Sequence, residues 1–173
     1  VEFPLINKQS GDTLKVLYLS NLQPSKGIED VIDAIALLVK QNKDVQLTVV
    51  GQWRDEQTEE RCLEKVTQQQ LPVIFTGPVY GSEKLQYFSQ VDVFVFPPRA
   101  PEGHPLVLVE AMAAGLPIIS ADQGAITESV LDGVNGFIIK SNNPEQIAEK
   151  LNQLIEHPEQ RIIMGNKSRE LYI

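Results

Sequence analysis

The stretch VDVFVFPPRAPEGHPLVLVEAMAAGLPIIS, residues 91–120, decides the fold class of this chain. An apolar run ends at Phe96, two prolines and a polar loop follow, and a helical pattern then covers 105–115. A further apolar run occupies 116–121. Short continuous apolar runs joined through a helix are typical of buried parallel strands. The stretch therefore predicts a strand–helix–strand unit of an α/β domain.

The same alternation continues on both sides of this stretch. Four more apolar runs bring the number of predicted strands to six, and they lie at 15–20, 45–51, 72–77 and 136–140. Apolar spacings of three and four predict the other helices, at 28–41, about 55–69, 82–90, 144–157 and from 158 onward. We expect a doubly wound, parallel, six-stranded Rossmann-like sheet with helices on both faces. Ligands of such sheets bind beyond the carboxyl ends of the strands.

Length and composition indicate one ordinary globular domain. The chain has 173 residues, 42% of them hydrophobic, and a formal net charge of −8. This acidic balance argues against a nucleic-acid surface, which would need a basic face, but local donors can still bind a phosphate-bearing small molecule. The single cysteine, Cys62, permits no intrachain disulfide and suits a reducing compartment. No apolar run approaches the length of a membrane span.

The two ends of the sequence suggest one part of a longer protein. Residues 1–14 have the composition of a linker, and the pattern at 168–173 stops while a helix is still running. We therefore expect residues 15–173 to form one domain, preceded in the whole protein by another.

The predicted helix over 105–115 begins at an anion site built from backbone. Pro105 is preorganised for the first helical position, where its missing N–H would have no partner. The free N–H groups of Leu106 and Val107 then point outward at the positive end of the helix dipole. Gly103 allows a ligand to approach the backbone closely. These residues predict a site for a phosphate group.

Two carboxylates flank this anion site. Glu110 stands on a helix that is otherwise apolar all round, and a helix of that kind is buried. A buried carboxylate needs a partner, which is either a neighbouring loop or a pair of ribose hydroxyls. Glu102 lies in the loop, where a solvated acid is the simpler interpretation.

The sequence EGHPLVLVE (102–110), followed by AMAAGLPII (111–119), resembles the E-x7-E motif of the family 4 retaining glycosyltransferases. In that family the motif lies in the C-terminal, donor-binding Rossmann-like domain of a two-domain GT-B fold. The resemblance covers nearly the whole chain, from about 15 to 171, and includes KG at 26–27, VVG at 49–51, FTGPV at 75–79 and DGVNGFII at 132–139.

The resemblance implies a role for each matching position. Glu102 would bind the donor sugar near the reacting carbon, and Glu110 would bind the ribose hydroxyls. The backbone from 103 to 107 would hold the distal phosphate. Lys26 would bind the diphosphate and stabilise the charge of the leaving group. Val79 would contact the base through its backbone, with Gln52 or Trp53 as a possible further wall.

The sequence departs from the family pattern at Asn21, where members commonly carry an arginine that makes a second diphosphate contact. Asn21 can donate a hydrogen bond but brings no charge. Arg99 could compensate, although an exposed arginine is the simpler expectation. His104 replaces a more usual aromatic residue and would pack at the edge of the sugar. Glu128 would either reach the donor site or cap its own helix, and the cap is favoured.

Three hypotheses of function follow from these residues. The first is retaining transfer of a sugar from a nucleoside-diphosphate sugar to a sugar or lipid-linked acceptor. The resemblance implies that this transfer needs no metal, which agrees with loops that carry neither a DxD motif nor a His–Cys cluster. The alternatives are a sugar-nucleotide epimerase and a non-catalytic nucleotide-binding module. The resemblance also implies polysaccharide or lipopolysaccharide synthesis in the cytoplasm, at the inner face of the membrane. We expect the isolated domain to bind donor weakly and to be inactive.

Overall fold

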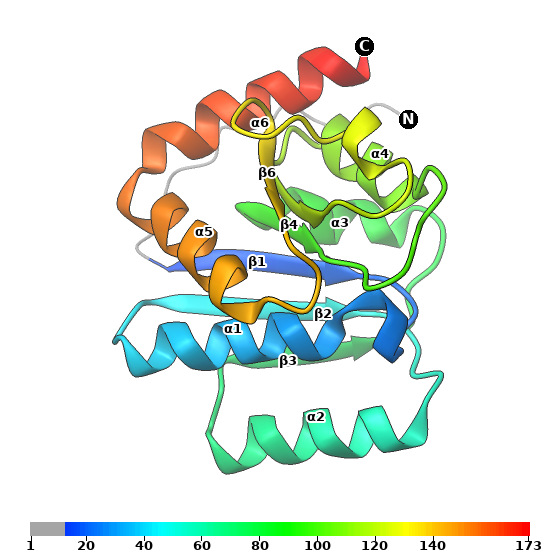
Figure 1. Ribbon diagram of the computed structural model, residues 1–173, viewed down its shortest axis with the longest axis vertical. Helices are drawn as coiled ribbons and strands as arrows, with labels where there is room; N and C mark the ends of the chain where they lie inside the picture. Colours follow the sequence, from blue (N-terminus) through cyan, green and yellow to red (C-terminus); the bar gives the residue numbers. More distant parts are fainter. Residues whose placement is uncertain (1–12) are drawn as a thin grey trace.

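The computed structural model describes residues 13–173 and shows one parallel sheet with helices on both faces (Figure 1). The strands are β1 (Leu14–Leu19), β2 (Val45–Val50), β3 (Val73–Gly77), β4 (Val93–Phe96), β5 (Ile118–Ala121) and β6 (Gly136–Ile139). The helices are α1 (Ile28–Lys40), α2 (Glu56–Gln68), α3 (Glu83–Ser89), α4 (Leu106–Ala113), α5 (Pro144–Glu156) and α6 (Pro158–Tyr172), with short 3-10 helices η1 (Pro24–Lys26) and η2 (Ile126–Glu128). The predicted fold class is confirmed.

The strand order is β3-β2-β1-β4-β5-β6, and every adjacent pair is parallel. The chain winds outward from β1 through β2 to β3, then returns to β4 and winds the other way. The loops that leave β1 and β4 therefore diverge at the centre of the sheet, which is where doubly wound folds bind their ligands. The sequence predicted six strands but not this order.

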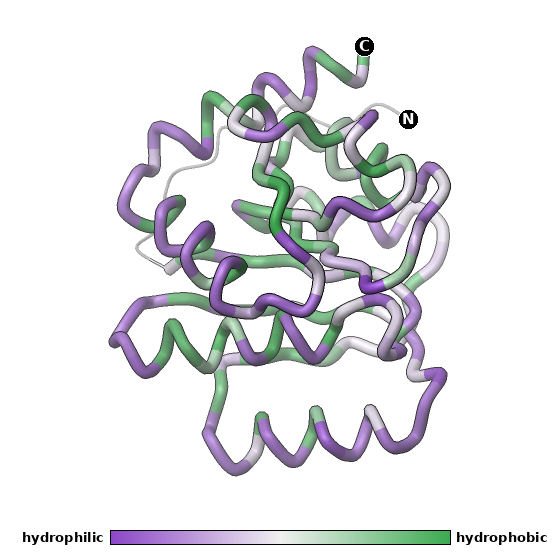
Figure 2. The backbone as a smooth tube through the Cα atoms, viewed as in Figure 1, coloured by the Kyte–Doolittle hydropathy of each residue, from purple (hydrophilic) through white to green (hydrophobic). Residues whose placement is uncertain are grey.

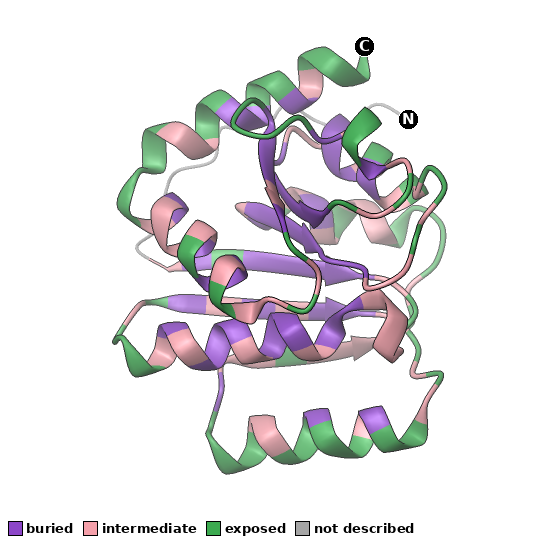
Figure 3. Cartoon of the chain, in the orientation of Figure 1, coloured by how far each residue is buried: buried purple, intermediate pink, exposed green. Residues whose placement is uncertain are grey.

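Helices α1, α2 and α5 cover one face of the sheet, and α3, α4 and α6 cover the other (Figure 1). Figure 2 shows the apolar residues concentrated in the strands and in α1, whereas α2 is mostly polar. Figure 3 shows the same division in burial: α1 is buried along one side, and α2 buries only Thr58 and Cys62. Burial of the central strands on both faces explains why their sequences are continuously apolar.

Close approach of backbone at the centre of the sheet requires glycine at position 27. Gly27 has φ +75° and begins α1, and a Cβ atom there would lie 2.0 Å from the carbonyl oxygen of Pro97. This approach brings the end of the β1 loop against the end of β4. It therefore places residue 26 beside the segment that follows β4.

The structure corrects two predicted boundaries and one prediction about burial. The linker prediction for 1–14 falls mostly on residues 1–12, which lie outside the described residues, and Leu14 belongs to β1. Helix α4 is shorter than the predicted 105–115, because Pro105 is its N-cap residue and not its first helical residue. The prediction that this helix is buried all round was wrong, since Leu106 is 76% exposed and Val109 is 36% exposed. Only the opposite side of α4 packs into the core.

Candidate functional site

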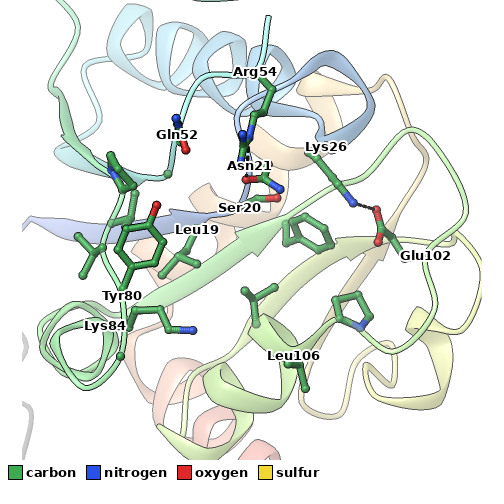
Figure 4. A pocket seen from close by; sticks show the side chains of 18 residues that line it. Leu19, Ser20, Asn21, Lys26, Gln52, Arg54, Tyr80, Lys84, Glu102 and Leu106 are labelled. Carbon is green, nitrogen blue, oxygen red and sulfur yellow. Dashed lines mark hydrogen bonds and ion pairs between the residues drawn. The ribbon is translucent and has the colours of Figure 1, made fainter.

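A pocket of about 480 Å³ opens at the carboxyl end of the sheet, where the strand order reverses (Figure 4). This volume is in the usual range for small-molecule sites. Its walls come from the loops after β1, β2 and β3, and from the segment that joins β4 to α4. The pocket therefore lies where the fold class predicts a ligand.

Lys26 and Glu102 meet inside this pocket. Their side chains are 23% and 16% exposed, and the Lys26 Nζ atom lies 2.5 Å from a carboxylate oxygen of Glu102 (Figure 4). The phenol of Tyr18 donates a hydrogen bond of 2.9 Å to the Lys26 carbonyl oxygen from the core below. Burial raises the pKa of Tyr18 well above its usual range, so this O–H remains a donor at all ordinary pH values. The structure thus brings together the two predicted catalytic residues.

The loop that carries Glu102 is held from two sides. Arg99 forms a two-pronged pair with the buried carboxylate of Asp30, at 2.9 and 2.8 Å. Glu102 itself pairs through its backbone with Gly124, where a Cβ atom would lie 2.0 Å from the Glu102 carbonyl oxygen. Arg99 therefore neither lines the pocket nor serves as a free surface charge, and the idea that it compensates for Asn21 was wrong. Its partner is the acid on α1.

The first turn of α4 presents backbone donors to the pocket. Leu106 and Val107 both line the pocket, and within residues 13–173 neither N–H has a hydrogen-bond partner. Pro105 precedes them in an extended conformation and ends the preceding loop. Two unpartnered N–H groups at a helix N-terminus form a site suited to an anion.

Glu110 lies behind the pocket and not in its wall. One carboxylate oxygen accepts a hydrogen bond of 2.7 Å from Lys84 Nζ, and the other oxygen is buried without a partner among the described residues. Lys84, which stands on α3, does line the pocket. The predicted contact of Glu110 with ribose therefore stays a prediction, and in this structure Lys84 stands between Glu110 and the pocket.

The structure gathers most, but not all, of the predicted site residues. Those that line the pocket are Asn21, Lys26, Val79, Glu102, Leu106 and Val107. Those outside its wall are Gly103, His104 and Glu110.

His104 is exposed, and its Nε2 atom lies 3.3 Å from a carboxylate oxygen of Glu128. Glu128 therefore faces His104 across the surface, and no side chain caps the short helix η2. The favoured prediction that Glu128 caps its own helix was wrong.

Three pocket residues escaped the sequence reasoning: Arg54, Tyr80 and Lys84. They lie after β2 and β3, in or beside loops that the fold class had marked, but no motif singles them out. Gln52 lines the pocket as suggested, whereas Trp53 packs on Phe75 with ring centroids 5.8 Å apart.

The pocket is positively charged within an acidic protein. Its ionisable lining residues are Lys26, Arg54, Lys84 and Glu102, which sum to +2, in a chain of formal charge −8. A local excess of cations in a concave site attracts anionic ligands against the overall charge.

Cys62 belongs to the core and not to the site. It is buried on the inner side of α2, and this burial raises the pKa of its thiol to about 12. Within residues 13–173, no group of three or more His, Cys, Asp or Glu side chains is placed to hold a metal ion. No helix in the same range has the length and apolar character needed to cross a membrane.

Comparison with known proteins shows that this chain is similar to part of several glycosyltransferases. A family model described as glycosyl transferases group 1 matches residues 3–171. The capsular polysaccharide biosynthesis glycosyltransferase CapM of Staphylococcus aureus is 27% identical over 95% of this chain and 42% of its own length. A GDP-mannose-dependent mannosyltransferase of Corynebacterium glutamicum is 30% identical over 87% of this chain and 40% of its own. The chain thus spans about two fifths of the length of the curated relatives it matches.

Solved structures show the same architecture. HepE of Anabaena, crystallised in complex with UDP and glucose, superposes with a TM-score of 0.86 at 26% identity, over 93% of this chain and 44% of HepE. The C-terminal domain of a glycosyl transferase group 1 protein, LpcC of Francisella tularensis, superposes with a TM-score of 0.83 at 26% identity, over 91% of this chain and 83% of that domain.

Proposed function

The chain belongs to the glycosyl transferases group 1 family, and from this premise we propose that its pocket binds the nucleoside diphosphate of a sugar donor. The observation that carries the proposal is the meeting of two kinds of anion-binding group in one pocket: Lys26, and the unpartnered N–H groups of Leu106 and Val107. A diphosphate supplies the negative charges and acceptor oxygens that these groups need. The complex of HepE with UDP and glucose supports the same class of ligand.

We propose retaining transfer of a hexosyl group. The bond between the anomeric carbon of the sugar and the distal phosphate oxygen breaks, and a bond to the acceptor hydroxyl oxygen forms on the same face. The leaving phosphate takes the proton of that hydroxyl, so no further base is required. Lys26 and the α4 N-terminus would stabilise the negative charge that develops on the phosphate. Glu102 would hold the sugar beside Lys26.

The remaining contacts of the donor complete the proposal. Val79 and Asn21 line the pocket, and they would contact the base and the diphosphate respectively. Glu110 would accept hydrogen bonds from the ribose hydroxyls once Lys84 moves aside, and its buried, unpartnered oxygen supports this role. Gly103 and His104 would contact the donor only if their loop moves toward the pocket.

We propose that the whole protein also binds an acceptor, through a domain that precedes this one, in the assembly of a polysaccharide or lipopolysaccharide. The name of the related CapM supports that class of product. The reaction would take place in the cytoplasm, at the inner membrane face, and without a metal. The 173-residue chain alone would transfer no sugar, and measurable transfer or donor hydrolysis by this chain would refute that point.

Titration of the chain with UDP, GDP and ADP, followed by calorimetry or NMR shifts, tests the proposed ligand. At least one of the three should bind, and binding of none would overturn the proposal.

The anion site can be tested by removing a single backbone N–H group. Leu106→Pro removes one N–H from the first helical position, where proline is tolerated. We expect binding of the nucleoside diphosphate to weaken about tenfold, the value of one charge-assisted hydrogen bond. Leu106→Ala is the matched control, because it removes the exposed side chain and keeps the N–H. Equal affinities of the two variants would show that this N–H does not bind the ligand.

A further inference from the structure

Arg54 stands in the pocket wall, on the loop that follows β2, and no motif assigns it a role. We infer that Arg54 is a second cationic ligand of the diphosphate, acting beside Lys26. The inference rests on the proposed function, and it names the residue that supplies charge on the side of the pocket lined by Asn21.

The contacts of the five arginines separate Arg54 from the others. All five lie within residues 13–173. Arg61, Arg99 and Arg161 each lie within 4 Å of a carboxylate, and Arg169 donates to the carbonyl oxygen of Ala113. The Arg54 guanidinium instead donates a hydrogen bond of 3.4 Å to the amide oxygen of Asn21, a neutral group. Within the described chain, Arg54 and Arg169 are therefore the arginines without a carboxylate partner, and of these two only Arg54 lines the pocket.

Hydrogen bonds fix the backbone around Arg54, and they thereby determine where its side chain begins. Leu22 donates to the Gln52 carbonyl at 2.9 Å, and Arg54 donates to the Leu22 carbonyl at 3.0 Å. These bonds extend the pairing of the sheet beyond β1 and β2. Trp53 packs inward, and Asp55 begins α2 as its N-cap by accepting from the Thr58 N–H. The guanidinium is thereby held over the loop that carries Asn21 (Figure 4).

The other cations of the pocket are already engaged. Lys26 is paired with Glu102, and Lys84 is paired with Glu110. A diphosphate that enters must compete with these carboxylates for both lysines, but it meets no acid at Arg54. The free charge of Arg54 is therefore the first that an incoming polyanion can neutralise at no cost to an existing ion pair.

The chemistry of the side chain fits a phosphate better than a base or a sugar. A guanidinium presents five N–H donors in a planar fork, which matches two phosphate oxygens at once. The contact with Asn21 uses the Nε–H and leaves the terminal nitrogens available. Asn21 then acts as a positioning residue, which holds the guanidinium by its amide oxygen.

Calorimetry with Arg54→Gln tests the inference. The ligands are whichever of UDP, GDP or ADP binds the unaltered chain, and the corresponding nucleoside. We expect the diphosphate to bind about tenfold more weakly and the nucleoside to bind as before, because the lost contact is a charge-assisted one to phosphate. Arg61→Gln is the matched control, since Arg61 is also exposed but pairs with Glu29 away from the pocket.

Rescue provides the second readout. The double variant Asn21→Arg/Arg54→Gln moves the arginine to position 21, which Arg54 contacts in the unaltered chain. Affinity for the diphosphate should then return to within about threefold of the unaltered chain. Equal weakening of nucleoside and diphosphate, or unchanged affinity in Arg54→Gln, would overturn the inference and leave the proposed function standing. Failure of the unaltered chain to bind any of the three diphosphates would overturn both.

Discussion

Two lysine–glutamate pairs flank the pocket, and both of their glutamates come from the same nine-residue stretch, 102–110. Their geometries are similar, with contacts of 2.5 Å in Lys26–Glu102 and 2.7 Å in Lys84–Glu110. The surroundings of the two pairs differ. In the first pair both side chains line the pocket, whereas in the second only the lysine does.

The two lysines also differ in how they are held. Lys26 is the last residue of the short 3-10 helix η1, it precedes Gly27, which packs against Pro97 just after β4, and its carbonyl oxygen accepts a hydrogen bond from the buried Tyr18. Lys84 stands in the first turn of α3, a helix of seven residues without a side-chain cap. The comparison teaches that Lys26 and Glu102 form a pair fixed inside the pocket, whereas Lys84 stands at the pocket wall in front of Glu110 on a helix that holds it less firmly.

The largest expected effect separates the two lysines directly. Lys26→Met should weaken binding of the nucleoside diphosphate about thirtyfold, within the range of a charge-assisted hydrogen bond, and Lys84→Met should weaken it no more than about threefold. Calorimetry on the two variants measures both values. Equal losses of affinity in the two variants would mean that both lysines contribute equally to binding, and would contradict the difference between the two pairs.

The second effect tests the hydrogen bond from the Tyr18 phenol to the Lys26 carbonyl oxygen. Tyr18→Phe keeps the ring and removes the O–H that bonds the Lys26 carbonyl, so the free energy of unfolding should fall by about 1 kcal/mol. Denaturant titration at pH 7 measures it.

The same phenol also makes the free energy of unfolding depend on pH. In the folded chain the pKa of Tyr18 is raised by burial, so its proton is released in the unfolded state first, above about pH 10. The stability of the unaltered chain should therefore decline as pH rises past that value. Tyr18→Phe should lose this component of the decline, and an identical pH profile in both proteins would contradict the assignment.

The third effect concerns the coupling within each pair. Double-mutant cycles with Lys26→Met/Glu102→Gln and Lys84→Met/Glu110→Gln should give coupling free energies of up to about 1 kcal/mol, larger for the first pair. The reason is that the Lys26–Glu102 pair is shorter and its carboxylate is less exposed. A larger coupling in the second pair would reverse the comparison.

The smallest effect has the opposite sign. Glu102→Gln removes the acid from a pocket that must accept a diphosphate, and it frees Lys26 from its partner. Binding of the nucleoside diphosphate without sugar should therefore strengthen by about threefold, the scale of one partly exposed charge contact. Calorimetry measures this change, and a loss of affinity would show that Glu102 itself holds the diphosphate.

Much of the fold could be predicted from local patterns. Continuous apolar runs gave all six strands within about two residues, because strands buried on both faces cannot carry polar side chains. The motif from 102 to 110 likewise pointed to the pocket. The same reasoning misjudged α4 as fully buried, since an apolar sequence does not distinguish contact with the core from contact with a pocket.

The sequence by itself determined the α/β class and the proline-led start of α4, because each depends on residue types a few positions apart. Lys26 and Glu102 became candidates through the resemblance of their local motifs to a known family. Only the tertiary structure decided which side chains meet. It paired Arg99 with Asp30, placed Lys84 before Glu110, and brought Arg54 against Asn21. These contacts join residues 26 to 69 positions apart, and the strand order that creates them is set by packing of the whole sheet and not by any local pattern.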